Sequence, residues 1–149
     1  MAVVGGLVTR LLRVIGVRRP SPAEAGTREL GMMGEGAAAS HLRSLGFKVL
    51  GRNLKVPMGE ADILCRQDDV VVLVEVKTRL RRRAAPLLSN TMAPEASVTL
   101  RKRRKLVSIA RHLKRANRWT RVRIDVVGVE YDDCSREPRV RHHAGVMWV

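Results

Sequence analysis

Three charged residues interrupt a stretch of sequence that is otherwise typical of buried strands. Glu75 and Lys77 lie inside the apolar run VVVLVEVKT, and Asp62 lies in a shorter strand-like stretch before it. Carboxylate oxygens are the ligands that hard divalent cations such as Mg²⁺ prefer. Two acids and a lysine that met in space could therefore hold a cation and activate water for hydrolysis of a phosphate ester.

A hairpin would bring the two acids together. Side chains alternate between the two faces of a strand, so Glu75 and Lys77 share one face and the valines between them share the other. If Asp68 and Asp69 form a two-residue turn, Asp62 lies directly opposite Glu75, with Cβ atoms about 4.5–5.5 Å apart. A loop of three residues would turn Asp62 to the apolar face. We therefore expect a loop of even length.

Two ionised carboxylates at this range repel one another. Charges about 4 Å apart interact by roughly 4 kcal/mol at an effective dielectric constant of about 20, and a small domain is stable by only about 5–15 kcal/mol. Lys77 supplies one positive charge, and Mg²⁺ or Mn²⁺ would supply two. The alternative is that Glu75 and Lys77 lie on a solvated face of the sheet and pair with their neighbours.

The overall charge points to a polyanionic partner. The 149 residues carry a net charge of +15, and residues 99–123 contain eleven lysines and arginines but no acid. Such a balance predicts attraction to nucleic acid first and to an anionic membrane second. Aromatic residues are scarce, which favours contacts to backbone phosphates over a stacking platform for single strands.

Two groups of cations are candidates for these phosphate contacts. The first group follows the apolar run and the second opens a predicted helix: Arg79, Arg81, Arg82 and Arg83, and then Arg101, Lys102, Arg103, Arg104 and Lys105. Five consecutive cations repel one another unless a polyanion is near, which favours phosphate binding over a solvated helix face.

Hydrophobic periodicity predicts the elements that position these residues. A helix is expected over residues 29–45, ended by Gly46 and weakened in its middle by Gly34 and Gly36. A second helix is expected over residues 98–117, with Thr99 as its N-cap. The strands are expected over residues 47–50, 61–66, 70–78 and 121–129, with an extra edge strand near 140–142, a turn at 51–53 and a long basic loop over 80–95.

These residues also carry a family resemblance. Asp62 followed by Glu75-Val76-Lys77 resembles the PD-(D/E)xK nucleases. The ordered blocks LGMMGEGAAASHLRSLGFKVLGRN, GEADIL, VVLVEVKTR, ASVTLRKRRKL and VRIDVVGVE, over about residues 30–130, resemble the YraN-like family, predicted relatives of archaeal Holliday-junction resolvases. The resemblance implies an α/β fold with a restriction-endonuclease-like α-β-β-β-α-β core, a mixed central sheet flanked by helices, and a homodimer. Arg103 stands where many relatives have Gln.

The resemblance also implies roles for single residues. Asp62 and Glu75 would bind Mg²⁺ or Mn²⁺, with the Val76 carbonyl as a further ligand, and Lys77 would orient the attacking water. Glu35, from GEGAAA, would contribute a ligand through water. The alternative for Glu35 is an ordinary exposed charge on a helix.

The ends of the chain and its cysteines bound the setting. Residues 1–25 are expected to form a basic tail or helix before a nuclease-like domain at 26–149, and the arginines within the tail's apolar stretch disfavour a signal peptide. No apolar stretch reaches the length of a membrane span. Cys65 and Cys134 lack the spacing of a zinc site. We therefore expect a cytoplasmic protein with free thiols.

Three functions stay open at this level. They are a Mg²⁺- or Mn²⁺-dependent endonuclease acting on DNA, branched DNA included; a nucleic-acid-binding protein that keeps a nuclease-like core without catalysis; and a membrane-surface protein that uses the basic N-terminus.

Two further features are weaker candidates for a functional site. Asp125 is expected to pair with Arg121 or Arg123, and adjacent His142 and His143 should point to opposite faces of a strand instead of sharing a metal.

Overall fold

The computed structural model describes residues 21–82, 98–135 and 137–149. It contains the predicted α-β-β-β-α-β order and the extra edge strand: α2 (Thr27–Ser44), β1 (Lys48–Val56), β2 (Gly59–Gln67), β3 (Val70–Arg81), α3 (Leu100–Asn117), β4 (Val122–Asp132) and β5 (Arg139–Trp148). The strands form one sheet in the order β1-β2-β3-β4-β5. Only the β3–β4 pair is parallel within it. This mixed α/β sheet with two helices is consistent with a restriction-endonuclease-like core.

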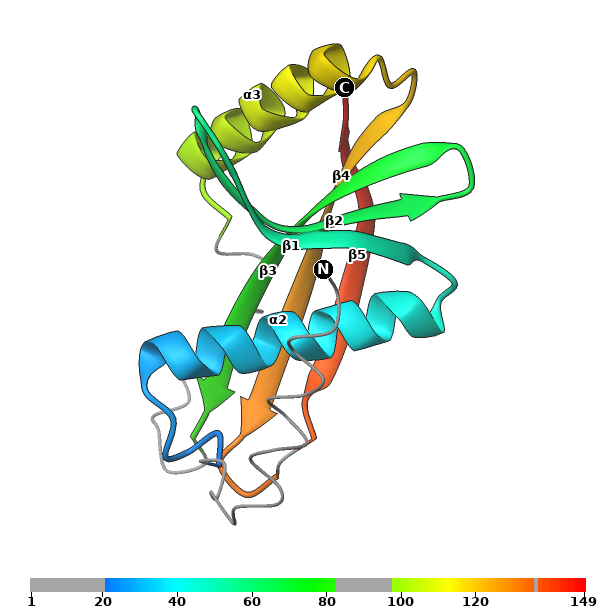
Figure 1. The fold of residues 1–149 in the computed structure, drawn as a ribbon. Coiled ribbons are helices and arrows are strands. Elements are labelled where there is room, and N and C mark those ends of the chain that lie inside the picture. Colours follow the sequence, from blue (N-terminus) through cyan, green and yellow to red (C-terminus); the bar gives the residue numbers. More distant parts are fainter. Residues whose placement is uncertain (1–20, 83–97, 136) are drawn as a thin grey trace, which may run out of the picture.

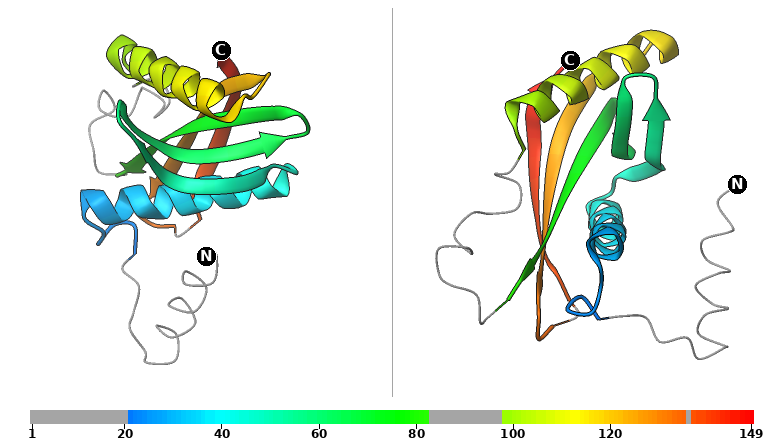
Figure 2. Two further views of the ribbon diagram at one scale, coloured as in Figure 1. Left: turned by 45° about the horizontal axis from the view of Figure 1, so that its top comes forward. Right: turned by 90° about the vertical axis from the view of Figure 1, so that its left-hand side faces the viewer.

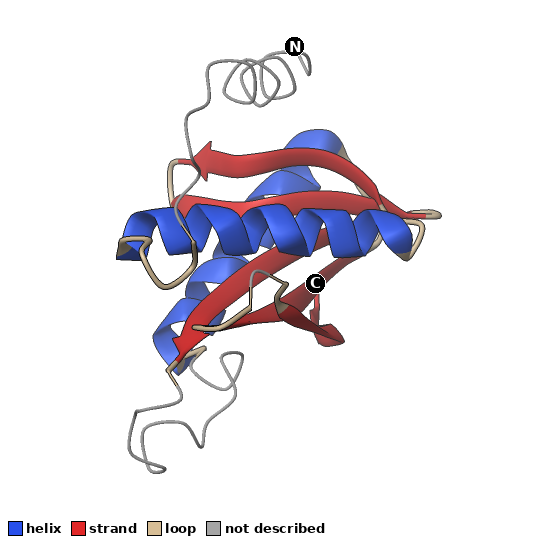
Figure 3. Ribbon diagram, turned by 90° about the horizontal axis from the view of Figure 1, so that it is seen from below, coloured by secondary structure: helices blue, strands red, loops and turns tan. Residues whose placement is uncertain are grey.

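The two helices pack on opposite faces of the sheet. Along β3, Val72 and Val74 belong to the core under α2, whereas Val71 and Leu73 belong to the core under α3. This explains why β3 is apolar on both faces, as a strand covered on both sides should be. Figure 1 and Figure 2 show α2 lying across the strands and α3 crossing the far end of the sheet. Figure 3 shows the same α2 from below.

Helix ends follow local sequence chemistry. Thr99 is the N-cap of α3, and its hydroxyl accepts a hydrogen bond from the Lys102 N–H at 3.3 Å. Gly46 follows α2 with φ of 86°, in the left-handed region that glycine enters without strain. Both expectations are confirmed.

Three strand boundaries differ from the predictions, because pairing partners decide them. β1 runs through residues 51–53, which were expected to form a turn, because they lie beside β2; a register shift between Val49 and Gly51 absorbs the irregularity. β3 extends to Arg81 because its last residues pair with β4. β5 is longer than residues 140–142 because it pairs along most of β4. The expected basic loop continues into residues 83–95, which lie outside the described residues, as do residues 1–20 of the expected tail.

Gly34 allows α2 to approach β3 closely. A Cβ atom at Gly34 would lie 1.8 Å from the Thr78 hydroxyl and 2.7 Å from its methyl carbon. A glycine that lowers helix propensity is therefore needed for the packing of helix on sheet, one residue before Glu35. At Gly36 a Cβ atom would meet nothing within 4 Å.

Gly34 and Gly36 form a matched pair for mutation. Gly34→Ala should lower the free energy of unfolding by about 1–3 kcal/mol, because overpacking exceeds the gain in helix propensity. Gly36→Ala should raise it by up to about 1 kcal/mol, because only helix propensity changes. Urea denaturation measures both, and equal effects of the two substitutions would contradict the close packing at Gly34.

Candidate functional site

The β2–β3 hairpin has the predicted register. Gln67 pairs with Val70 across a two-residue turn, and the ladder continues to Ile63 opposite Val74. Asp62 is the next residue, at the point where the two strands part. Its Oδ2 accepts a hydrogen bond from the Val76 N–H at 2.7 Å. The carboxylate of Asp62 is thus held at β3, beside Glu75, as the even-length loop requires.

Glu75 is buried in the sheet, with 2% of its surface exposed. Lys77 Nζ lies 3.1 Å from its Oε1, and Lys102 Nζ, from α3, lies 3.0 Å from its Oε2. Oε2 nevertheless has no hydrogen bond of good geometry. The Lys102 contact is therefore an ion pair by distance without an aligned N–H, and one buried oxygen of Glu75 is incompletely satisfied.

Glu35 reaches the same region from α2. It is 18% exposed, and its Oε2 forms an ion pair with Arg52 at 3.3 Å. Its negative charge contributes to the raised pKa of Asp62, as the weakest of the causes. Glu35 is therefore more than an isolated exposed charge, and it lies near the acid pair while being held by β1.

The pKa of Asp62 is raised to about 7. Burial is the main cause, because desolvation disfavours the charged form, and the nearby charge of Glu75 adds to it. The Val76 N–H and the positive charge of Lys102 act in the opposite direction. Repulsion between the two carboxylates, which the hairpin predicts, is thus the second cause of the raised pKa after burial, and a bound cation would oppose both.

The acids fit a divalent cation as a pair better than as a trio. Within the described residues, the three-residue group whose ligand atoms all lie within 4.8 Å of one another is Asp132, Asp133 and Cys134, at the turn after β4. Glu35, Asp62 and Glu75 do not meet that distance together. The unsatisfied oxygen of Glu75 and the carboxylate of Asp62 supply the hard oxygen donors that Mg²⁺ or Mn²⁺ prefers, whereas the carboxylate of Glu35 is already paired with Arg52.

The first group of predicted phosphate-binding cations is divided among different surroundings. Arg79 is paired with Glu130, which is 7% exposed and lies beside it in the parallel β3–β4 register. Arg81 and Arg82 are exposed. Arg83 lies outside the described residues. Arg79 was predicted to bind phosphate, and the structure shows that its guanidinium is already paired with a buried glutamate.

The run of five cations in α3 is split between two sides of the helix. Lys102 and Lys105, one turn apart, line a concavity with Lys55 and Glu60 near the acid pair. Arg103 and Arg104 line a groove of about 970 Å³ on another side of the helix, with Arg111 and Arg115. Lys102 and Lys105 are three residues apart and so share a side of the helix, whereas Arg103 and Arg104, between them in the sequence, line the other surface. Four of the five cations are therefore divided between two positively charged surfaces.

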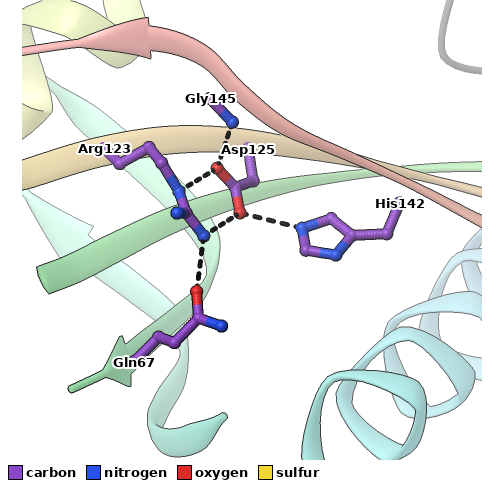
Figure 4. A network of polar contacts seen from close by, with 5 residues as sticks. All are labelled: Gln67, Arg123, Asp125, His142 and Gly145. Carbon is purple, nitrogen blue, oxygen red and sulfur yellow. Dashed lines mark hydrogen bonds and ion pairs between the residues drawn. The ribbon is translucent and has the colours of Figure 1, made fainter. Parts of the chain in front are cut away.

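Asp125 is a buried acid of a different kind (Figure 4). Its two oxygens lie within hydrogen-bond distance of Arg123 Nε and Nη2, His142 Nε2 and the Gly145 N–H, all at 2.8–3.0 Å. Burial alone would raise the pKa of Asp125, but the hydrogen bonds from His142, Arg123 and Gly145 outweigh it and lower that pKa.

These contacts confirm the expected pairing with Arg123, while Arg121 pairs with Asp69. His143 is exposed, whereas His142 faces Asp125. Because its oxygens already have donors, Asp125 joins β4 to β5 and is a poor metal ligand.

Two features of the site were not anticipated from the sequence. Lys102 was expected to bind phosphate, and nothing in the run of cations indicated which of them would reach Glu75. The burial of Glu130 was also missed, although its place in an apolar strand was a signal. Cys65 is buried and Cys134 is exposed, and they form no disulfide. No helix among the described residues combines the length and the hydropathy of a membrane span.

Comparisons with known proteins agree with the resemblance. The family model described as "Uncharacterised protein family UPF0102" matches residues 34–129, a stretch that contains every acid and lysine of the candidate site. A UPF0102 protein of Syntrophomonas wolfei is 41% identical over 108 residues, 71% of this chain and 88% of that protein. A UPF0102 protein of Mycolicibacterium smegmatis is 39% identical over 120 residues, 79% of this chain and 92% of that protein.

The raised pKa of Asp62 predicts a pH-dependent stability. Between the ordinary value of 3.8 and about 7, the folded protein holds a proton that the unfolded chain has lost. The contribution of Asp62 is therefore full below the lower value and is lost as the pH rises through the upper one. Asn carries no charge at any pH, so Asp62→Asn should stabilise the protein in EDTA by about 2 kcal/mol near pH 8, where Asp62 is ionised, and little near pH 5. The figure is smaller than the full pKa shift implies because Asp62 is partly exposed to solvent.

The control is Asp69→Asn, on the turn of the same hairpin. The pKa of Asp69 is lowered by its hydrogen bond to Arg121, so this substitution should destabilise near neutral pH. Thermal unfolding across pH measures both variants. An Asp62→Asn variant whose stability follows that of the wild type at every pH would show that the pKa of Asp62 is not raised in the folded protein.

Proposed function

Because the chain belongs to the uncharacterised protein family UPF0102, the YraN-like family that its sequence resembles, we propose its function from its own geometry. The protein is a Mg²⁺- or Mn²⁺-dependent endonuclease that hydrolyses phosphodiester bonds of nucleic acid, with DNA as the favoured substrate. The supporting observation is the buried Glu75, with an oxygen that lacks an aligned donor, beside a second carboxylate at Asp62.

Each residue of the site has a role that its surroundings support. Asp62 and Glu75 hold the cation, with the Val76 carbonyl as a further ligand and Glu35 acting through water. A cation bound there would polarise a phosphoryl oxygen and lower the pKa of a water molecule. Lys77, whose Nζ lies 3.1 Å from Glu75 Oε1 and whose side chain is 32% exposed, reaches both Glu75 and solvent. It orients the attacking water and balances negative charge on the phosphate.

Nucleic acid is the partner that the charge distribution favours. Lys102, at the start of α3, touches Glu75, and the exposed Lys105 lines the same concavity, so cations adjoin the acid pair. Backbone phosphates bound along this helix would be delivered to the cation site. The proposal includes a cytoplasmic location, where the thiols stay reduced, and a homodimer, which the family resemblance suggests.

Cleavage of DNA tests the assignment. The wild type should nick plasmid DNA or a four-way junction in Mn²⁺, and Asp62→Ala and Lys77→Ala should each reduce the rate by about a hundredfold or more. Asp69→Ala, on the exposed β2–β3 turn, should cleave like the wild type. Cleavage at one rate by all four proteins would remove Asp62 and Lys77 from the mechanism.

The salt dependence of DNA binding tests the phosphate contacts. If about six phosphates are neutralised, the logarithm of the affinity should fall with the logarithm of salt concentration with a slope near about −5. Lys105→Gln should make the slope about one unit shallower. Arg121→Gln, whose cation is paired with Asp69, is the control and should leave the slope unchanged.

The same measurements address the rival function. A protein that bound DNA with a steep salt slope, but neither cleaved it nor gained thermal stability from Mn²⁺, would be a nucleic-acid-binding protein without catalysis. A real cation site should raise the melting temperature of the wild type and not that of Asp62→Ala, because a ligand of the native state stabilises it.

A further inference from the structure

Two lysines from different elements contact Glu75. Lys77 is two residues from Glu75 on β3, whereas Lys102 comes from the first turn of α3 and meets the other oxygen of Glu75. Both carboxylate oxygens of Glu75 thus already face an ammonium group. A cation that used Glu75 as a ligand would have to share an oxygen with a lysine or displace it.

Of the two lysines, Lys102 is the one that is easier to displace. Its Nζ lies 3.0 Å from Oε2, yet that oxygen has no aligned hydrogen bond. The two lysine side chains are almost equally exposed, at 31% for Lys102 and 32% for Lys77, so the missing hydrogen bond is what distinguishes them. An ion pair without an aligned N–H gives up less when it is replaced, because charge-assisted hydrogen bonds supply much of the strength of such pairs.

The start of α3 offers the displaced ammonium group an anionic partner. The first turn of α3 contains no acidic residue, although the N-terminus of a helix favours negative charge. Lys102 shares its side of the helix with Lys105, and Lys55 borders the same concavity. Glu60 also borders this concavity, but it is one acid beside three lysines. The surface therefore keeps an excess of positive charge, which a backbone phosphate would satisfy together with the helix terminus.

We propose that Lys102 is a positioning residue that couples cation binding to phosphate binding, an inference that rests on the proposed function. Without a cation, Lys102 neutralises Oε2 of Glu75. When a divalent cation takes that oxygen, Lys102 turns to a phosphate of the bound nucleic acid beside α3. Each ligand favours the position of Lys102 that the other needs, so the energy of breaking the Lys102–Glu75 ion pair is paid only once. The two ligands therefore bind with positive cooperativity.

Calorimetric titration with Ca²⁺, with and without a short DNA duplex, measures this coupling without cleavage. Lys102→Met should bind Ca²⁺ at least about fivefold more tightly than the wild type when no DNA is present, because the competing ammonium group is gone. The duplex should raise the Ca²⁺ affinity of the wild type by a larger factor than that of Lys102→Met. Lys105→Met removes a charge from the same side of α3 without touching Glu75, and should match the wild type in the absence of DNA.

Lys102→Gln is the second variant, to be used if Lys102→Met does not fold, and it should show the same gain. Suppose that the wild type binds Ca²⁺, that Asp62→Ala abolishes this binding, and that the Lys102 variants bind Ca²⁺ no more tightly than the wild type. This result would overturn the inference and leave the cation site in place. Ca²⁺ binding that is absent in the wild type, or unchanged in Asp62→Ala, would overturn the proposed function and the inference together. A lysine that only held α3 in place would leave the coupling factor unchanged.

Discussion

A carboxylate buried within a sheet has to be neutralised by charges brought to it, and Glu75 imposes this requirement on the whole molecule. Removing such an ion from water costs several kcal/mol, and Glu75 is 2% exposed. The compensating charges come from β3 itself and from the first turn of α3. The position of α3 is thereby linked electrostatically to the centre of the sheet, in addition to its apolar packing.

The buried acids of this protein differ in how completely their oxygens are satisfied. Asp125 accepts from a guanidinium, an imidazole and a backbone N–H, and Glu130 is paired with Arg79. Burial and the neighbouring charge of Glu75 raise the pKa of Asp62 to about 7, and the one backbone N–H that it accepts offsets this only in part. Fully satisfied acids join strands, whereas an incompletely satisfied pair retains capacity for a cation. Burial alone would not separate these two roles.

Close packing by α2 and the helical repeat of α3 shape the surroundings of the acid pair. Gly34 sets α2 directly on Thr78, which places the neighbouring Glu35 within electrostatic range of Asp62. On the other face of the sheet, the helical repeat sends Lys102 and Lys105 toward the site and Arg103 and Arg104 into the groove along α3. One run of five cations therefore becomes two surfaces, and only one of them adjoins the acids.

Strand alternation and a two-residue turn are local properties, so the amino-acid pattern was enough to predict that Asp62 and Glu75 lie side by side. Hydrophobic periodicity was likewise enough to predict the order of the elements and the α/β class, and the residue type predicted the N-cap at Thr99. Other features depend on contacts between distant segments: the pairing of Glu35 with Arg52, of Arg79 with Glu130, and of Lys102 with Glu75. These pairings follow from the tertiary fold alone, because the twist of the sheet and the rotation of each helix select one partner among many cations of similar reach.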